Sequence, residues 1–169
     1  SPNHGHMLIA GNEDGSITVV NDVTNSSSVQ KSKANFAIQD VQLGLSQPNV
    51  FIAAGSDGNM GVFDIRDRIQ PQISWNASPA SKADINAVAW NPVESSAHLL
   101  CTGDDAGVLK IWDLRGVSSD ASSAVIKEIS GYHRSPINSI QWCPSNESVC
   151  MVCSDTEASV YDFLIERDF

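Results

Sequence analysis

The sequence predicts an all-β fold built from repeated four-stranded units, and two observations predict it. Three segments repeat one pattern: an apolar strand, a tight acidic turn, and a second strand that ends in an aromatic residue followed by Asp. The aligned Asn or Asp positions are 21, 64, 113 and 162, so the repeats are spaced by 43, 49 and 49 residues. Such a period, with an aromatic-Asp pair, is typical of β-propeller blades.

The individual strands follow from short runs of β-branched and aromatic residues between turn signals. The best-defined repeat predicts strands at 72–75, 85–90, 98–102 and 108–112, and the last predicts them at 125–128, 137–144, 149–152 and 159–162. An eroded first copy, ending in Val20-Asn21, supplies two more. With three full sets of four, the chain has about 14 strands, and no helical period competes.

This strand count predicts an incomplete propeller, because seven four-stranded blades need about 28 strands. The expected repeats are 7–22, 23–66, 67–115 and 116–169, preceded by residues 1–6 as a possible tag or native loop. Blades stabilise one another through neighbouring interfaces. We therefore expect the open ends to be covered by the missing propeller half or by self-association.

The aromatic-Asp pairs resemble those of WD repeats, intact in Trp112-Asp113 and varied in Phe63-Asp64 and Tyr161-Asp162. The repeated turns also each carry an Asp, which can accept backbone N–H groups and tolerate unusual dihedral angles. These residues are interpreted as structural: Asp57, Asp105 and Asp155. The resemblance implies that such an Asp pairs with a His before the innermost strand, and His133 is the candidate in the last repeat.

Composition excludes several classes of function. The His residues are scattered and no glycine-rich phosphate loop is present, so we expect no enzyme activity and no cofactor. The ends of Cys150-Met151-Val152-Cys153 would point to opposite faces of a strand and could not share a metal ion, so no metal site is expected. No apolar run is long enough to span a bilayer.

Charge favours a basic partner. The chain has 20 acidic and 10 basic residues, a net charge of −10, which disfavours nucleic acid and can steer basic proteins. Solubility alone is the alternative explanation. In a propeller the acidic turns and the loops before the innermost strands emerge on one face. The predicted client-binding face contains these residues: Glu13, Asp14, Asp40, Asp84, Asp104, Asp105 and Glu157.

A more specific resemblance covers roughly residues 36 to 168 and is strongest from His133 to Asp168. This stretch resembles the last repeat of the glutamate-rich WD-repeat proteins, ribosome-assembly relatives of histone-binding WD proteins, and the tail Glu166-Arg167-Asp168 is its most specific mark. The resemblance implies a nuclear or nucleolar chaperone, able to shuttle with the cytoplasm, whose client is a ribosomal protein or a histone.

Two alternatives use other residues. One is suggested by a resemblance to the W-D-x-R pattern of substrate receptors for cullin-type ubiquitin ligases, seen in Asp64-Ile65-Arg66 and Trp112-Asp113-Leu114-Arg115. In this interpretation Arg66 and Arg115 are docking residues. A surface ion pair is the simpler explanation for both arginines. The other alternative is a generic peptide scaffold with aromatic anchors at Tyr132, Trp75 and Trp90. Since Trp90 and Trp142 share one repeat position, they are expected in the core.

Overall fold

The protein is represented by a computed structural model that describes residues 7–21, 29–66, 69–117 and 121–164. The possible tag at 1–6 and the tail Glu166–Asp168 lie outside the described residues. The strands are β1 (Leu8–Gly11), β2 (Ser16–Val20), β3 (Val29–Lys33), β4 (Ile38–Leu43), β5 (Val50–Gly55), β6 (Asn59–Asp64), β7 (Pro71–Asn76), β8 (Ile85–Trp90), β9 (Leu99–Asp104), β10 (Leu109–Asp113), β11 (Val125–Ile129), β12 (Ile137–Trp142), β13 (Val149–Ser154) and β14 (Ala158–Asp162).

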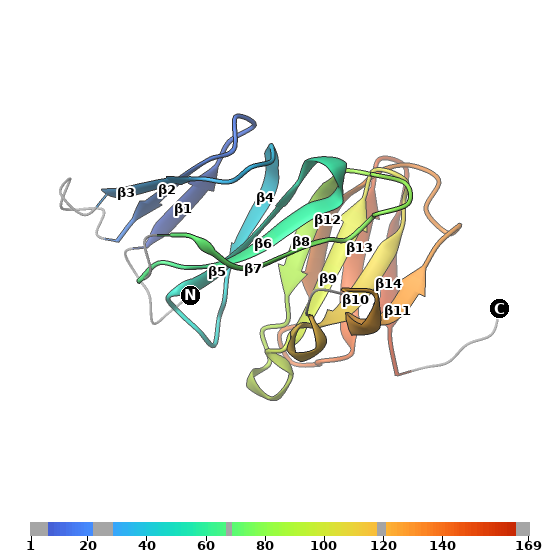
Figure 1. The fold of residues 1–169 in the computed structure, drawn as a ribbon. Coiled ribbons are helices and arrows are strands. Elements are labelled where there is room, and N and C mark those ends of the chain that lie inside the picture. Colours follow the sequence, from blue (N-terminus) through green and yellow to red (C-terminus); the bar gives the residue numbers. More distant parts are fainter. Residues whose placement is uncertain (1–6, 22–28, 67–68, 118–120, 165–169) are drawn as a thin grey trace.

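These strands form four antiparallel sheets that stand side by side, as the blades of a propeller do (Figure 1). We call them the first sheet (β1–β3), the second sheet (β4–β7), the third sheet (β8–β11) and the last sheet (β12–β14). The architecture is a partial β-propeller, as the repeat pattern predicts. Helical structure in the described residues is confined to short 3-10 turns.

Each complete sheet takes its outermost strand from the following sequence repeat. β7 belongs to the repeat that contains Trp112, yet it pairs with β6 of the second sheet, and β11 likewise pairs with β10. This offset ties consecutive repeats together covalently and through hydrogen bonds. The second and third sheets are four-stranded, whereas the described parts of the first and last sheets have three strands.

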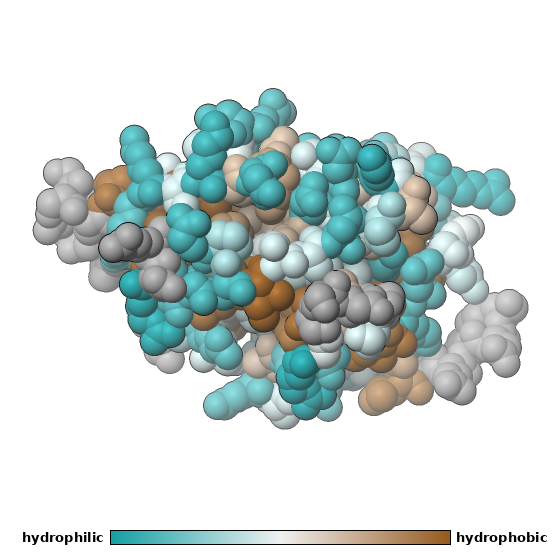
Figure 2. Space-filling model, in the orientation of Figure 1, coloured by the Kyte–Doolittle hydropathy of each residue, from teal (hydrophilic) through white to brown (hydrophobic). Residues whose placement is uncertain are grey.

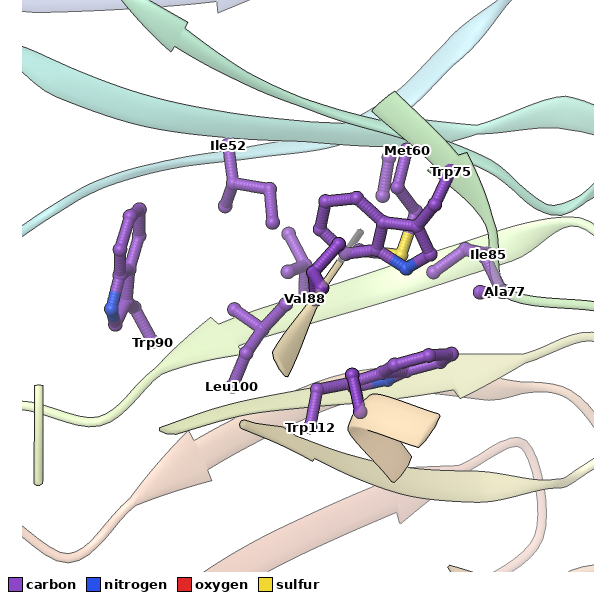
Figure 3. Packing of buried hydrophobic residues seen from close by; sticks show 12 residues of the cluster. Ile52, Met60, Trp75, Ala77, Ile85, Val88, Trp90, Leu100 and Trp112 are labelled. Atoms are coloured by element: carbon purple, nitrogen blue, oxygen red, sulfur yellow. The ribbon is translucent and has the colours of Figure 1, made fainter. Parts of the chain in front are cut away.

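The hydrophobic core lies between the sheets. One cluster joins the second and third sheets and includes Ile52, Trp75, Trp90 and Trp112 (Figure 3). Similar clusters join the first to the second sheet and the third to the last. Because strand residues alternate between faces, each central sheet buries one set of side chains against each neighbour.

The close contact between the third and last sheets requires a glycine, which has no side chain, at position 103 of β9. A Cβ atom added at Gly103 would lie 2.3 Å from Cγ2 of Ile137, which begins the innermost strand of the next sheet. The corresponding contact in the first sheet joins Gly11 to Ile38. Glycine at the end of these strands therefore makes a notch for the isoleucine of the neighbouring sheet.

The two ends of the sheets carry different loops. We call one end the turn face: it holds the tight turns at 12–15, 56–58, 105–108 and 155–157 and the loops that precede β4, β8 and β12. The opposite end, the loop face, holds the connections that follow β4, β6, β8, β10 and β12, with the 3-10 turns Glu94–Ser96, Leu114–Gly116 and Ala121–Ala124. Backbone bonds tie neighbouring sheets together at the turn face, including Ile38 N–H to Asn12 O (3.2 Å) and Asp105 N–H to Asp84 O (3.0 Å).

Candidate protein-binding surface

Exposed carboxylates line the turn face across all four sheets. The tight turns contribute these exposed residues: Glu13, Asp14, Asp57, Asp105, Asp155 and Glu157. Asp84, in the loop before β8, is half-buried among them. Figure 2 shows hydrophilic side chains along its upper edge, where these turns lie in Figure 1. The topology thus brings together most of the acidic residues that the sequence places on one face.

Hydrogen bonds fix the positions of some of these carboxylates. Asp14 Oδ1 accepts the backbone N–H of Ser16 at 2.9 Å, and hydrogen bonds from Ser16 lower the pKa of Asp14. Asp84 Oδ1 accepts the N–H of Asp57 at 2.8 Å and so spans the second and third sheets. Asp155 accepts a hydrogen bond from the Asn138 side chain. By contrast, the Glu13 and Asp105 carboxylates make no hydrogen bond or ion pair within the described part of the chain.

The turn residue Asp57 has the unusual dihedral angle that the sequence predicts, with φ 56°. However, the carboxylate that accepts a backbone N–H at this turn belongs to Asp84, in the neighbouring sheet. Asp57 itself is exposed, and its carbonyl oxygen accepts the Asn76 side chain at 2.6 Å. Its carboxylate is therefore part of the acidic surface.

The assignment of Asp104 to the surface was wrong. Its side chain is 3% exposed, and Oδ1 accepts the N–H groups of Ala106 at 3.0 Å and Val108 at 2.8 Å. Burial raises the pKa of this carboxyl group. The neighbouring Asp105, expected to play this structural role, is exposed instead. Asp104, on the last position of β9, therefore has the structural role expected of Asp105, and only Asp105 of the two contributes to the acidic surface.

Asp40 also lies away from the acidic surface. It is on β4, and its carboxylate accepts the N–H of Val88 at 2.9 Å and of Val41 at 2.8 Å. Burial raises the pKa of Asp40. Its partner Val88 is on β8, so the half-buried Asp40 links the innermost strands of two sheets.

Basic residues also stand among the carboxylates: Lys33, at the end of β3, interacts with Asp14, and sequence reasoning missed two further cations. Lys82, in the loop before β8, and Arg134, in the loop before β12, are exposed on the turn face. The signal was available, since these loops were already assigned to this face. The turn face is therefore predominantly, not uniformly, acidic.

His133 makes different contacts from those implied by the WD resemblance. This buried ring lies with Nε2 3.0 Å from the Tyr161 hydroxyl and Nδ1 3.5 Å from Glu157 Oε1. Asp155, the expected partner, instead contacts Asn138. In the third sheet the related polar contacts are Trp112 Nε1–H to Thr102 Oγ1 at 2.9 Å and Ser78 Oγ to Asp104 at 3.4 Å.

The repeated Asp after the aromatic residue has one structural role in all three repeats. Oδ1 of Asp64, Asp113 and Asp162 accepts the backbone N–H two residues later, at 2.9, 3.0 and 3.1 Å. Asp162 also accepts the Ser148 hydroxyl at 2.7 Å. These carboxylates therefore shape the chain as it leaves the third strand of each sheet.

Arg66 and Arg115 lie on the loop face, opposite the acidic turns. Each guanidinium folds back on the Asp two residues before it, with Nη2 to Oδ2 distances of 2.6 Å to Asp64 and to Asp113. Hydrogen bonds from the guanidinium groups lower the pKa of both carboxyls to about 2. The arginine side chains remain 69% and 68% exposed, so both are accessible while they are ion-paired.

The loop face also has apolar grooves between sheets. A groove of about 310 Å³ between the second and third sheets is lined by Trp90 and Arg115 among others, and one of about 410 Å³ follows between the third and last sheets. Trp75, Trp90 and Trp142 are buried, which confirms the expectation for the Trp90 and Trp142 position. Tyr132 is 57% exposed.

Cysteines and other possible metal ligands form no metal-binding group in the part of the chain that the structure describes. Cys101 and Cys150 are buried, whereas Cys143 and Cys153 are half-buried, and all four are free thiols. No group of three or more His, Cys, Asp or Glu side chains suited to a metal ion occurs among the described residues. Within the same ranges, no helix is long and apolar enough to span a membrane.

The blade-like sheets and their exposed turn face define the class: a β-propeller scaffold for protein interaction. Comparison with protein families agrees, because residues 71–113 match the family "WD domain, G-beta repeat". The chain belongs to the WD-repeat proteins. WD repeats generally form non-catalytic scaffolds.

Three relatives show the range of proteins in which similar sequence occurs. The chain is 36% identical over 134 residues to ribosome assembly protein rrb1 of Schizosaccharomyces pombe, covering 78% of this chain and 27% of that protein. It is 29% identical over 125 residues to protein transport protein SEC31 of Dictyostelium discoideum, covering 71% of this chain and 8% of that protein. It is 31% identical over 110 residues to GATOR2 complex protein WDR59 of Gallus gallus, covering 65% of this chain and 10% of that protein. The chain thus spans at most about a quarter of these relatives.

Proposed function

We propose that this chain binds a basic client protein on its turn face, within a ribosome assembly protein. The observation that carries the proposal is the series of exposed carboxylates on the tight turns of four adjacent sheets. Similarity to ribosome assembly protein rrb1 supports the biological setting and favours a ribosomal protein as client. A histone is the other basic client to test, and a nuclear or nucleolar location is part of the proposal.

The physical basis is long-range attraction between unlike charges. Exposed carboxylates spread over several turns attract a lysine-rich segment without a deep pocket, and they raise its rate of association. Each contact contributes little because water and ions screen exposed charges, so binding depends on their number. Such binding weakens as the ionic strength rises.

The test is capture of partners by the full-length parent protein from cell extract at low and at high salt, followed by identification of the bound proteins. The variant Glu13→Gln with Asp105→Asn removes two charges that make no internal hydrogen bond or ion pair within the described residues. The control, Glu94→Gln with Glu147→Gln, removes two exposed charges on the loop face.

We expect a basic ribosomal protein or histone to be captured, to dissociate at high salt, and to be depleted by the first variant but not by the control. Partners that are insensitive to salt and to both variants would contradict the proposal. Recovery of vesicle-coat components, in line with the SEC31 relatives, would also contradict it.

A second candidate function is docking to the adaptor of a cullin-type ubiquitin ligase. It is favoured by the identical, exposed geometry of Arg66 and Arg115 on the loop face. The variant Arg66→Ala with Arg115→Ala would abolish capture of such an adaptor and leave binding of the basic client intact. Absence of any adaptor from the unmodified protein's partners would exclude this function.

A further inference from the structure

A buried histidine lies directly behind one carboxylate of the turn face. The His133 side chain is 1% exposed, and its Nδ1 atom lies 3.5 Å from Oε1 of Glu157. Within the described residues this nitrogen makes no hydrogen bond. The Glu157 side chain is 44% exposed, so the same carboxylate faces the imidazole on one side and solvent on the other. A cation that arrives from solvent therefore meets a carboxylate that already has a neighbour inside the protein.

The other ring nitrogen of His133 is held by a phenol. Its Nε2 atom lies 3.0 Å from the Tyr161 hydroxyl. Burial raises the pKa of Tyr161, so the phenol keeps its proton and donates it to Nε2 while the imidazole is neutral. Nδ1 then carries the ring hydrogen and directs it at Glu157. When Nε2 takes up a second proton, the Tyr161 oxygen accepts it in turn, and the contact with Glu157 becomes an ion pair.

Among the described sheets, this pair of side chains occurs in the last one alone. His133 stands four residues before β12, and Glu157 stands just before the residue that pairs with Cys153. The residues at these two positions are Ala34 and Asn59 in the second sheet, and Ser81 and Val108 in the third. None of these four side chains titrates. The pair is therefore not required to form a turn of this kind.

The other charged groups around His133 keep their charge near neutral pH. The turn of the third sheet packs on the His133 loop, since a Cβ atom added at Gly107 would lie 2.5 Å from the His133 carbonyl oxygen. Imidazole ordinarily changes charge between pH 5 and 8, whereas carboxylates, phenols, thiols and guanidinium groups ordinarily do so outside that range. The titratable and charged side chains on the elements packed around His133 are Glu157 and Asp155 of the β13–β14 turn, Tyr161 of β14, Cys150 of β13, Tyr132 and Arg134 of its own loop, and Asp104 and Asp105 of the neighbouring turn.

We propose that Glu157 binds a lysine or arginine side chain of the client in competition with the proton of His133. Such competition rests on the proposed function, because it regulates binding on the same turn face. While the imidazole is neutral, the charge of Glu157 attracts the cation of the client. Once the imidazole is charged, Glu157 is paired from inside, and the cation of the client is repelled by a like charge behind the carboxylate.

The consequence is a reciprocal coupling between client and proton. Client binding makes proton uptake by His133 less favourable, and proton uptake weakens client binding by the same factor. Mild acidification therefore loosens the client at the last sheet, whereas the carboxylates on the other sheets keep their charge. This dependence on pH is separate from the dependence on salt that any acidic surface shows.

The experiment measures the dissociation constant of a fluorescent lysine-rich peptide from the full-length parent protein at pH 7.5 and pH 5.5, at one low ionic strength. Glu157→Gln removes the shared carboxylate. Its matched control, Asp105→Asn, removes an exposed carboxylate of the same face that has no hydrogen bond or ion pair within the described residues. His133→Gln removes the titrating ring, and His98→Gln, on the loop face, is the control for loss of a histidine.

We expect the unmodified protein to bind the peptide about fivefold more weakly at pH 5.5 than at pH 7.5, as sites with modest coupling do. Asp105→Asn and His98→Gln should keep this ratio. Glu157→Gln and Asp105→Asn should both weaken binding at pH 7.5, but only Glu157→Gln should bring the ratio of the two dissociation constants close to one. His133→Gln should also bring the ratio close to one. If that variant does not fold, the comparison of Glu157→Gln with Asp105→Asn still decides.

Two outcomes would overturn the competition and leave the proposed function standing. One is a Glu157→Gln protein with the same pH ratio as the unmodified protein. The other is an unchanged affinity of that variant at pH 7.5, although Asp105→Asn weakens binding. If instead the peptide does not bind, or Glu13→Gln with Asp105→Asn has no effect at either pH, the proposed function fails and the competition fails with it.

Discussion

The Asp113 carboxylate binds the guanidinium of Arg115 through two contacts, with Oδ2 2.6 Å from Nη2 and Oδ1 2.9 Å from Nε. Asp113 simultaneously accepts the backbone N–H of Arg115 at 3.0 Å, so one carboxylate accepts hydrogen bonds from both the backbone and the guanidinium of Arg115. The same arrangement joins Asp64 to Arg66. The repeated Asp therefore both shapes the chain and orients a cation on the loop face.

This contact predicts a pH dependence of stability. Hydrogen bonds from Arg115 lower the pKa of Asp113 to about 2 from an ordinary value of 3.8. Between these values the unfolded chain binds more protons than the folded one, so this contribution to stability is complete above about pH 5 and is lost progressively as the pH falls through about 2. Arg115→Ala should reduce the loss, measured by urea unfolding at pH 5 and pH 3.

The control for this measurement is Arg134→Ala, which removes an exposed arginine with no ion pair in the described part of the chain. It should leave the difference in unfolding free energy between the two pH values close to that of the unmodified protein. Equal losses in the Arg115→Ala and unmodified proteins would show that the contact does not perturb Asp113 in solution.

Adjacent substitutions at 104 and 105 should have very different effects. Asp104→Ala removes the acceptor of the part-buried hydrogen bonds from the N–H groups of Ala106 and Val108, which costs about 1–3 kcal/mol of unfolding free energy. Asp105→Ala changes an exposed carboxylate and should stay within about 0.5 kcal/mol. Denaturant unfolding of both variants makes the comparison, and similar values for the two would contradict the assigned roles.

The strands could be predicted from the sequence because alternation of apolar residues and turn signals are local properties. The sequence could not predict which of Asp104 and Asp105 is buried, since this depends on whether β9 ends one residue earlier or later. The assignment of Asp40 to the acidic surface was wrong for another reason: its hydrogen-bond partner Val88 lies 48 residues away in the chain, on another sheet. Hydrogen bonds between sheets, including that from the Asp57 N–H to Asp84, leave no local signal. By contrast, Lys82 and Arg134 could have been found by counting cations in the loops already assigned to the turn face.

The notch at Gly103 predicts a strong and local steric effect. A Cβ atom there would lie 2.3 Å from Ile137 Cγ2 and 2.7 Å from its Cβ, both in the neighbouring sheet. Gly103→Ala should therefore lower the unfolding free energy by about 1–3 kcal/mol, as overpacking does. Thermal and urea unfolding measure the change.

Gly116→Ala is the matched control, since the nearest atom to its added Cβ would be 3.5 Å away, an ordinary contact. That variant should be neutral or slightly more stable, because alanine restricts the unfolded chain. If Gly103→Ala proved as stable as Gly116→Ala, the third and last sheets would not be in the close contact described.

The buried hydrogen bond from the Trp112 indole to Thr102 Oγ1 should contribute measurably to the third sheet. Both residues are 1% exposed and the bond is 2.9 Å long. Thr102→Val keeps the side-chain shape but leaves the indole N–H without its acceptor, at a cost of about 1–3 kcal/mol. Trp112→Phe removes the donor and also leaves a cavity, so its own cost is larger and mixed in origin.

A double-mutant cycle separates these contributions. Once Trp112→Phe has removed the donor, Thr102→Val should cost about 1 kcal/mol less than in the unmodified protein, because no indole N–H remains to be left unpaired. Thr18→Val, on the part-exposed face of β2, is the control for replacing threonine by valine in a strand. Strict additivity of the two core substitutions, measured by urea unfolding, would mean that the third sheet depends on the volume of Trp112 and not on its hydrogen bond.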